Sequence, residues 1–340
     1  MNPAQNRTGF ASASSHDSHD VTAGCRAAAQ LDKSTLLPAP ADPTTTVSRR
    51  PAPALSRSCS AGRVTRVGGN AGGRNFPRAQ RLRWVQITAA GAQSLLFPAM
   101  VASEVVLTNA RGLHAVPIAE HVLGVMLSFA RKLHLARDAQ NQGRWQQEAL
   151  WNDAPAFREL AGETLGLLGL GGIGLAVATR ARAFGMRVLG LRRRALPAPE
   201  VDEIVPRERL HDLLGRSHVV VASLPSTTET TAFLGGGEFS AMRSDALLVN
   251  VGRGRVIDEK ALIRALEQGR PAGAALDVFA EEPLPAESPL YRMPQVLVTP
   301  HVAGVTPHYW PRLMDIFREN LRRYLKGGAL LNRVDKHAGY

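Results

Sequence analysis

The stretch Thr164-Leu-Gly-Leu-Leu-Gly-Leu-Gly-Gly-Ile-Gly174 decides the fold of this chain. Its first part, Leu165–Gly169, is a short apolar run that predicts a strand, and Ile173–Phe184 predicts a helix. The glycine pattern G-x-G-x-x-G falls on the turn between them. Such a pattern is weak evidence alone, but a strand before it and a helix after it are the context of a dinucleotide-binding turn.

Each glycine of this turn has a reason to lack a side chain. Gly169 permits the tight turn, Gly171 lets the backbone approach a pyrophosphate, and Gly174 lets the helix pack closely on the sheet. Backbone amides near Gly172 and Ile173 would point at phosphate from the positive end of the helix. The sequence therefore predicts a dinucleotide site, and the alternative is a glycine-rich turn without a ligand.

Strands and helices alternate from this turn onward. Continuous apolar runs such as Val219-Val-Val221 suit strands that are covered on both faces. This alternation predicts the α/β class, with a Rossmann doubly wound parallel sheet and right-handed crossovers. The expected later strands are 187–191, 218–223, 246–251, 273–278 and 295–299, and the expected helices are 207–214 and 258–268, the latter with Asp258 at its N-cap.

The pattern is sparser before the glycine turn. Two short strands are predicted, at 82–87 and 105–109, followed by one long helix from Pro117 to about Gln140. Proline suits the first turn of a helix, and apolar residues recur along this segment at helical spacing. A last helix, 306–325, is expected to return to the first domain.

The end of the second strand bears on the choice of cofactor. In a dinucleotide fold, an acidic residue about 20 positions beyond the glycine turn holds the ribose hydroxyls. This chain has Arg192-Arg193-Arg194 there instead. Arginine forms charge-assisted hydrogen bonds to a 2′-phosphate, which an acidic residue would repel. Arg192 and Arg193 therefore favour NADP(H) over NAD(H), and a basic turn that tolerates either cofactor is the alternative.

Three polar residues, Arg253, Glu282 and His301, each follow the end of a predicted strand. The carboxyl ends of parallel strands are where such folds bind their ligands. An arginine fork can hold a carboxylate, and a histidine oriented by a carboxylate can deliver a proton near neutral pH. Each residue alone has an ordinary structural explanation. Together, after a dinucleotide motif, they predict the reduction of a 2-keto acid by hydride.

In this order the motifs resemble the D-isomer-specific 2-hydroxyacid dehydrogenases, especially the glyoxylate/hydroxypyruvate reductase and phosphoglycerate-dehydrogenase-like members. The resemblance covers about residues 82–328. The matching segments are Gly166-Leu-Leu-Gly-Leu-Gly-Gly-Ile-Gly174, Leu224-Pro-Ser-Thr-Thr-Glu-Thr-Thr231, Leu248-Val-Asn-Val-Gly-Arg-Gly254, Ala275-Leu-Asp-Val-Phe279, Glu282-Pro283-Leu284, Thr299-Pro-His301 and, upstream, Ile118-Ala-Glu-His121.

The resemblance implies a role for each matching position. Arg253 would bind the substrate's carboxylate and carbonyl, and His301, paired with Glu282, would be the general acid in reduction and the base in oxidation. It also implies a small 2-keto or 2-hydroxy acid substrate, D specificity, a homodimer with its cofactor domains in contact, and no metal. His114 and His121 are interpreted as helix-start and packing residues. The other implied contacts are Asp277 with the nicotinamide carboxamide, Leu224, Pro225, Thr230 and Val251 with the cofactor, and the amides of Ala90, Gly91 and Ala92 with the substrate carboxylate.

The N-terminal part departs from the family pattern. The family's substrate domain is flavodoxin-like and begins near the N-terminus, whereas residues 1–80 show no strand or helix period. We expect 1–80 to be a disordered or non-native basic arm. We expect 81–115 and 305–328 to be the remnant of an incomplete flavodoxin-like substrate domain, and 116–304 to be the Rossmann domain with its leading helix. Gln93 stands where relatives often carry aspartate. A catalytically weak or inactive dinucleotide-binding protein is therefore the alternative function.

The net charge of +12 is concentrated at the N-terminal end, where residues 1–80 carry ten Lys and Arg against four Asp and no Glu. A basic arm could bind nucleic acid, but only Phe10 and Phe76 accompany these cations, too few for a stacking platform. A nucleic-acid partner is therefore not expected. Cys25 and Cys59 are too few for a disulfide framework or a zinc site. The sequence has no apolar run of membrane-spanning length and no apolar signal segment, so we expect no membrane association and a cytoplasmic location.

Overall fold

The computed structural model describes residues 76–192 and 198–339 of the chain. Most of the predicted basic arm over 1–80 lies outside these residues, as does Arg193. The described part begins with a short 3-10 helix, η1 (Phe76–Arg78), in which the Phe76 ring packs edge-on against Phe97, with 5.2 Å between ring centroids. Residues 76–78, which were expected to belong to the disordered or non-native arm, are therefore folded.

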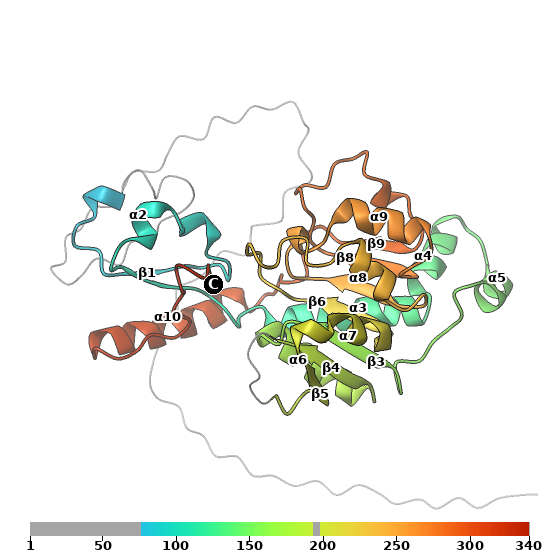
Figure 1. Cartoon of the computed structure of the whole chain (residues 1–340), viewed down its shortest axis with the longest axis horizontal. Helices are drawn as coiled ribbons and strands as arrows, with labels where there is room; N and C mark the ends of the chain where they lie inside the picture. The colour runs from blue at the N-terminus through green and yellow to red at the C-terminus, as the bar shows by residue number, and fades with distance from the viewer. Residues whose placement is uncertain (1–75, 193–197, 340) are drawn as a thin grey trace, which may run out of the picture. The chain divides into compact units, whose positions relative to one another are not determined.

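A seven-stranded parallel sheet forms the centre of the larger part of the fold (Figure 1). Its strand order is β5-β4-β3-β6-β7-β8-β9, so the order reverses between β3 and β6. This confirms the predicted doubly wound Rossmann sheet, and it places the glycine turn after β3 at the point of reversal. The strands are β3 (Thr164–Leu168), β4 (Arg187–Leu191), β5 (Glu203–Val205), β6 (Val219–Ala222), β7 (Leu247–Asn250), β8 (Gly273–Leu276) and β9 (Val296–Val298).

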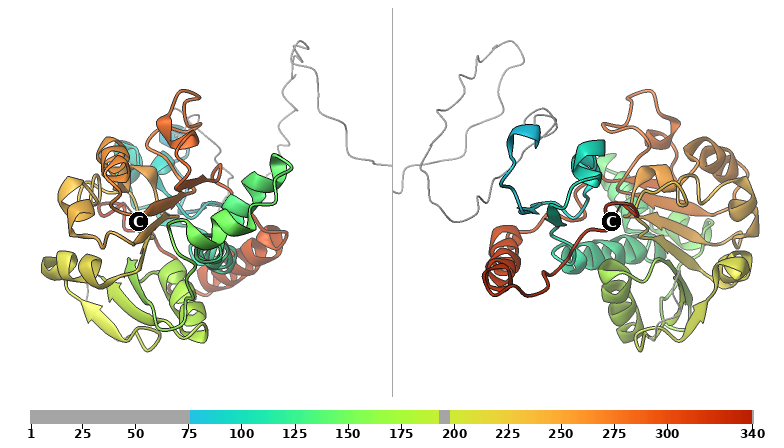
Figure 2. Two further views of the ribbon diagram at one scale, coloured as in Figure 1. Left: turned by 90° about the vertical axis from the view of Figure 1, so that its right-hand side faces the viewer. Right: turned by 60° about the vertical axis from the view of Figure 1, so that its left-hand side comes forward.

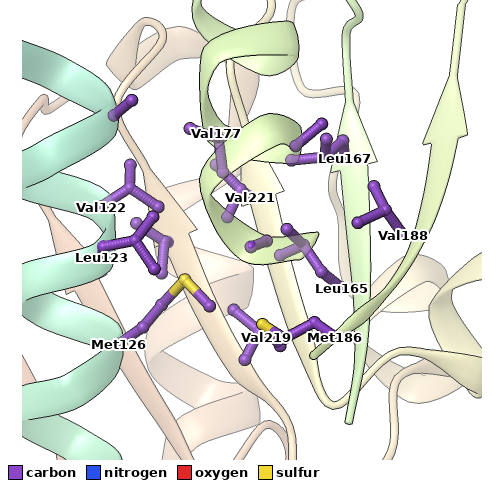
Figure 3. Packing of buried hydrophobic residues seen from close by; sticks show 14 of the residues in the cluster. Val122, Leu123, Met126, Leu165, Leu167, Val177, Met186, Val188, Val219 and Val221 are labelled. Carbon is purple, nitrogen blue, oxygen red and sulfur yellow. The ribbon is translucent and has the colours of Figure 1, made fainter. Parts of the chain in front are cut away.

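Helices cover both faces of this sheet, which explains why most residues of its strands are apolar. Val219 and Val221 face one layer of helices, whereas Val220 faces the other. Figure 3 shows the first of these cores, where Val122 and Met126 point from α3 toward the strands. The first layer contains α3 (Ala115–Ala130) and α6 (Gly172–Ala183), and the second contains α7 (Leu210–Arg216), α8 (Gly236–Ala241) and α9 (Glu259–Glu267). Short 3-10 helices are η3 (Arg207–Arg209), η4 (Gly254–Val256) and η5 (Pro289–Tyr291).

The N-cap predicted for α9 is present. The Asp258 side chain accepts a hydrogen bond from the Ala261 amide at 3.0 Å, which satisfies one of the free amides at the helix start.

The single long helix predicted from Pro117 to about Gln140 is wrong. The chain forms α3, then turns at Lys132, whose backbone is left-handed with φ of 52°, and continues as α4 (Leu133–Asn141). The buried Lys132 ammonium donates to the Leu150 carbonyl and, at 2.8 Å, to that of Asp153. These carbonyls lie at the end of α5 (Gln147–Asn152), a helix the sequence did not predict. A contact distant in sequence therefore holds the break in place.

A smaller lobe is built around β1 (Trp84–Gln86) and β2 (Val106–Thr108), which pair in parallel, and α10 (Tyr309–Leu325) packs against them (Figure 2). The Trp84 indole stacks on Phe317 and Tyr324, with ring centroids 5.8 Å and 5.4 Å away. Among the described residues this sheet has two strands. Two short helices complete the lobe, η2 (Gln93–Leu95) and α2 (Pro98–Val101). Within the described ranges, none of the helices is long and apolar enough to cross a membrane.

Candidate active site

The glycine turn has the geometry that a dinucleotide pyrophosphate requires. Gly169 has φ of 101°, which a residue with a Cβ rarely adopts. A Cβ on Gly174 would lie 2.1 Å from the Gly169 carbonyl oxygen, so only glycine allows α6 to start so close to β3. Gly171, the N-cap of α6, has nothing within 4 Å of the position of a Cβ, and Gly172 beside it is also exposed. The start of α6 is therefore open toward a ligand, and the turn fits a bound pyrophosphate.

Most of the other predicted cofactor residues follow the carboxyl ends of β4, β6 and β7. Leu224 lies after β6, with its side chain 3.2 Å from where a Cβ on Gly169 would be, while Val251 after β7 is buried. The Thr230 hydroxyl donates to the Pro225 carbonyl at 2.6 Å and thereby stabilises the loop after β6. Ile173 is half-buried in the first turn of α6, and Arg192 is half-buried directly after β4.

Ser223 is a residue of this region that sequence reasoning missed. Its hydroxyl donates to the Gly169 carbonyl at 3.0 Å, which ties the loop after β6 to the glycine turn. A serine at the end of an apolar strand is a weak signal by itself, because many such residues only face solvent.

His301 and Glu282 form a hydrogen-bonded pair, as the family resemblance implied. His301 Nδ1 lies 2.7 Å from Glu282 Oε2, and Glu282 Oε1 accepts from the Phe279 amide at 3.0 Å. Burial raises the pKa of the Glu282 carboxyl. This effect of burial is outweighed by the hydrogen bonds from His301 and Phe279 and by the charges of His301 and Arg253. The pKa of Glu282 therefore lies below its ordinary value. Glu282 is therefore ionised at neutral pH and holds the imidazole with Nε2 free to act.

Asp277 holds the loop that carries His301. The backbone of His301 is left-handed, with φ of 54°, which is uncommon for a residue other than glycine. Its amide donates to the Asp277 carbonyl at 2.9 Å, and the buried Asp277 carboxylate accepts from the amides of Val302 and Ala303 at 2.9 Å and 3.0 Å. The Thr299 hydroxyl donates to the same carboxylate at 2.6 Å. Asp277 thus fixes the strained backbone of His301.

Arg253 follows β7 and faces the loop at 90–92. Its Nη1 donates to the Gly252 carbonyl at 2.7 Å, and Nη2 would be 3.1 Å from a Cβ on Gly91. The structure thus brings the predicted carboxylate-binding arginine to the predicted substrate loop. Asn109, which the sequence analysis did not select, donates to the Ala90 carbonyl at 2.7 Å and fixes this loop. Of the loop residues, Ala92 is buried.

The two histidines of α3 have different surroundings. His114 Nδ1 lies 3.0 Å from the Gly304 carbonyl, in keeping with its interpretation as a helix-start residue. His121 Nε2 lies 3.4 Å from the Thr299 hydroxyl, and therefore borders the Asp277 network. Burial lowers the pKa of His121, and the charge of Asp277 only partly opposes that effect. His121 thus has a neighbour in the site that its sequence position did not reveal. Within residues 76–192 and 198–339, no three His, Cys, Asp or Glu side chains gather as a metal site would need.

A doubly wound sheet with a dinucleotide turn, and with a histidine–glutamate pair and an arginine beyond the carboxyl ends of its strands, is the construction of a nicotinamide-dependent oxidoreductase. The model of the family "D-isomer specific 2-hydroxyacid dehydrogenase, NAD binding domain" matches residues 123–303. The chain belongs to this family of D-2-hydroxyacid dehydrogenases.

Individual relatives agree with this assignment. A glyoxylate reductase from Korarchaeum cryptofilum is 33% identical over 265 residues, covering 77% of this chain and 78% of the relative. A D-3-phosphoglycerate dehydrogenase from Archaeoglobus fulgidus is 31% identical over 267 residues. The match covers 76% of this chain but only 48%, about half, of that relative. An NADPH-dependent glyoxylate/hydroxypyruvate reductase from Sinorhizobium meliloti, solved with NADP and sulfate, is 29% identical with a TM-score of 0.68, covering 78% of this chain and 82% of that one.

These findings confirm the predicted family, fold and enzyme class. The protein is an oxidoreductase that binds a nicotinamide dinucleotide and transfers hydride between it and a 2-hydroxy or 2-keto acid. The alternative, a dinucleotide-binding protein without activity, is not favoured.

Proposed function

We propose that this enzyme reduces a small 2-keto acid of the glyoxylate or hydroxypyruvate type to the D-2-hydroxy acid, with NADPH as the preferred reductant. The observation that carries the proposal is the 2.7 Å contact between His301 Nδ1 and Glu282 Oε2. It is supported by Arg253, whose Nη2 borders the Gly91 loop. A proton donor and a carboxylate-binding cation are the two groups that reduction of a 2-keto acid requires.

Each of these residues has a defined task in the proposed reaction. Arg253 binds the substrate carboxylate and polarises the neighbouring carbonyl, while the amides of Ala90, Gly91 and Ala92 bind the carboxylate from the other side. When bound, the nicotinamide supplies the hydride that the carbonyl carbon receives. His301 donates the proton to the carbonyl oxygen from Nε2, because Nδ1 is engaged with Glu282. In the oxidative direction the same nitrogen accepts the hydroxyl proton.

We propose the following cofactor contacts. The amides of the 169–174 turn bind the pyrophosphate, the segments at Leu224–Pro225 and at Thr230 and Val251 line the cleft, and Asp277 contacts the carboxamide. Arg192, directly after β4, favours the 2′-phosphate of NADP(H), and Arg193 lies outside the described residues. Two related enzymes support this preference, since one was solved with NADPH and another with NADP. A basic turn that accepts both cofactors remains the alternative.

We also propose a homodimer with the cofactor domains in contact. Trp145 and Trp151, before and within α5, are 89% and 72% exposed in the single chain. Large aromatic side chains are enriched at protein interfaces. Two tryptophans exposed to solvent in one short segment therefore indicate a surface that a second subunit covers. Sedimentation equilibrium should give twice the monomer mass, and a monomer at micromolar concentration would contradict the proposal.

A substrate and cofactor panel tests the proposed function. NADPH and NADH oxidation should be followed at 340 nm with glyoxylate, hydroxypyruvate, pyruvate and larger 2-keto acids. We expect turnover of the small acids, and a higher kcat/KM with NADPH than with NADH. Turnover of none of these acids with either cofactor would contradict the proposal.

A further inference from the structure

The loop that carries His301 is supported from outside the site by a chain of side chains that starts on α3. His121 Nε2 lies 3.4 Å from Thr299 Oγ1, and Thr299 Oγ1 donates to Asp277 Oδ1 at 2.6 Å. Asp277 in turn accepts from the amides that follow His301. Three side chains thus connect a helix of the first layer to the catalytic loop.

Proton counting fixes the direction of these hydrogen bonds. A hydroxyl has one proton, and Thr299 gives it to the Asp277 carboxylate, which can only accept. The Thr299 oxygen can therefore only accept from His121, so the His121 ring carries its proton on Nε2. Because each donor polarises the next, the donation from His121 strengthens the bond from Thr299 to Asp277.

The loop needs this support because its backbone is strained. His301 has φ of 54°, and such a conformation in a residue with a Cβ persists only where surrounding contacts determine it. Asp277 supplies those contacts, through its carbonyl to the His301 amide and through its carboxylate to the next two amides. A change in the position of Asp277 therefore changes the position of the His301 imidazole.

We infer that His121 is a positioning residue for the reduction reaction. Through Thr299 and Asp277 it fixes the backbone of His301, so that the imidazole is aligned with both Glu282 and the substrate carbonyl. The inference rests on the proposed function, because it assumes that His301 delivers the proton. Within the described part of the chain, His121 forms no hydrogen bond with Arg253 or with the 90–92 loop, so it should affect turnover more than substrate binding.

Kinetics of His121→Leu, which removes the donor at similar volume, test this inference. We expect kcat to fall roughly 10-fold or more, since small misplacement of a reacting group can cost up to about 100-fold. The KM for the keto acid should stay within about twofold. His121→Gln, whose amide can still donate, should recover most of the rate. His134→Leu is the matched control, because His134 lies on α4 and contacts the Ser128 carbonyl, so its kinetics should equal those of the wild type.

A second pair of variants tests the same chain without changing His121. Thr299→Val removes the hydroxyl and should lower kcat, whereas Thr299→Ser keeps it and should not. The double variant His121→Leu/Thr299→Val should be no slower than the slower single variant, because both changes break one connection. The comparison of Thr299→Val with Thr299→Ser also tests the inference if His121→Leu does not fold.

Several outcomes would overturn the inference. They are a wild-type kcat in His121→Leu, equal impairment in His121→Leu and His121→Gln, or multiplied effects in the double variant. Absence of turnover in the wild-type enzyme would instead contradict the proposed function and the inference together, so the two failures are distinguishable.

Discussion

Glu282 uses one carboxylate oxygen for His301 Nδ1, at 2.7 Å, and the other for the Phe279 amide, at 3.0 Å. The carboxylate is thus fixed to the backbone on one side and fixes the imidazole on the other. A fixed anion at Nδ1 orients the ring and leaves Nε2 to donate the proton in the proposed reduction.

Glu282→Gln should therefore lower kcat/KM for keto-acid reduction by about 10-fold to 100-fold, part of the 10²- to 10⁴-fold that a positioned acid contributes. Glutamine keeps the shape but not the charge. Glu281→Gln, which changes the neighbouring exposed carboxylate, is the control and should leave the rate unchanged. Steady-state kinetics with NADPH and glyoxylate check this, and equal rates for both variants would show that the Glu282 charge is not needed.

Arg192→Asp should shift the cofactor preference toward NADH. Aspartate repels a 2′-phosphate and can accept from the ribose hydroxyls. Hydrogen bonds to charged groups contribute about 1.5–3 kcal/mol, so the ratio of kcat/KM for NADPH to that for NADH should fall roughly 10-fold to 100-fold. Arg137→Asp on α4 changes the net charge equally and should leave the ratio unchanged. The same ratio in both variants would contradict a role for Arg192.

The stability of the fold should decrease as the pH falls below about 6.5, partly because of His218. Its Nδ1 accepts from the Thr164 amide at 3.0 Å, and burial together with the charges of Arg243 and Arg158 lowers its pKa against the opposing effect of nearby acids. The unfolded chain then binds a proton that the folded chain does not, so stability is lost as the pH falls from the ordinary histidine value toward the folded one.

His218→Asn tests this explanation, because its amide oxygen can accept from the same backbone amide and does not titrate. Thermal unfolding between pH 5 and pH 8 should show a smaller loss of Tm on acidification than in the wild type. The exposed His337→Asn serves as the control and should keep the wild-type slope. An unchanged slope in His218→Asn would show that other groups cause the acid sensitivity.

Two glycine substitutions in helices should act in opposite directions. Gly174→Ala places a Cβ 2.1 Å from the Gly169 carbonyl oxygen, so it should displace the start of α6, weaken cofactor binding and lower Tm. Gly124→Ala, in the exposed middle of α3, meets nothing within 4 Å and should stabilise the fold by about 0.5–1 kcal/mol. Calorimetry and NADPH fluorescence titration check both. Equal NADPH affinity in the two variants would contradict the proposed turn geometry.

The sequence was a good guide where local pattern and topology agree. The glycine turn and the doubly wound parallel sheet follow from the apolar runs and from the alternation of strands and helices. Because parallel strands place their carboxyl ends on one edge, Arg253, Glu282 and His301 were expected at the same edge of the sheet. The pairing of Glu282 with His301 was what the family resemblance implied, and the two side chains are in contact.

The sequence was a poor guide where contacts distant in the chain decide the structure. Lys132 carries no turn signal, yet it adopts a left-handed conformation because its ammonium binds carbonyls near residues 150 and 153. His121 follows the apolar period of α3 and was interpreted as a packing residue. Its contact with Thr299 joins positions 178 residues apart, which no local pattern could indicate.

The oxidation of NADPH by glyoxylate should be compared between the wild-type enzyme, His301→Ala and Arg253→Ala, because these residues are the proposed proton donor and carboxylate-binding group. We expect turnover by the wild type, a loss of roughly 10²- to 10⁴-fold in kcat/KM for His301→Ala, and a strong rise in the glyoxylate KM for Arg253→Ala. Wild-type rates in both variants would contradict these roles, since the proton donor and the carboxylate-binding group would then lie elsewhere.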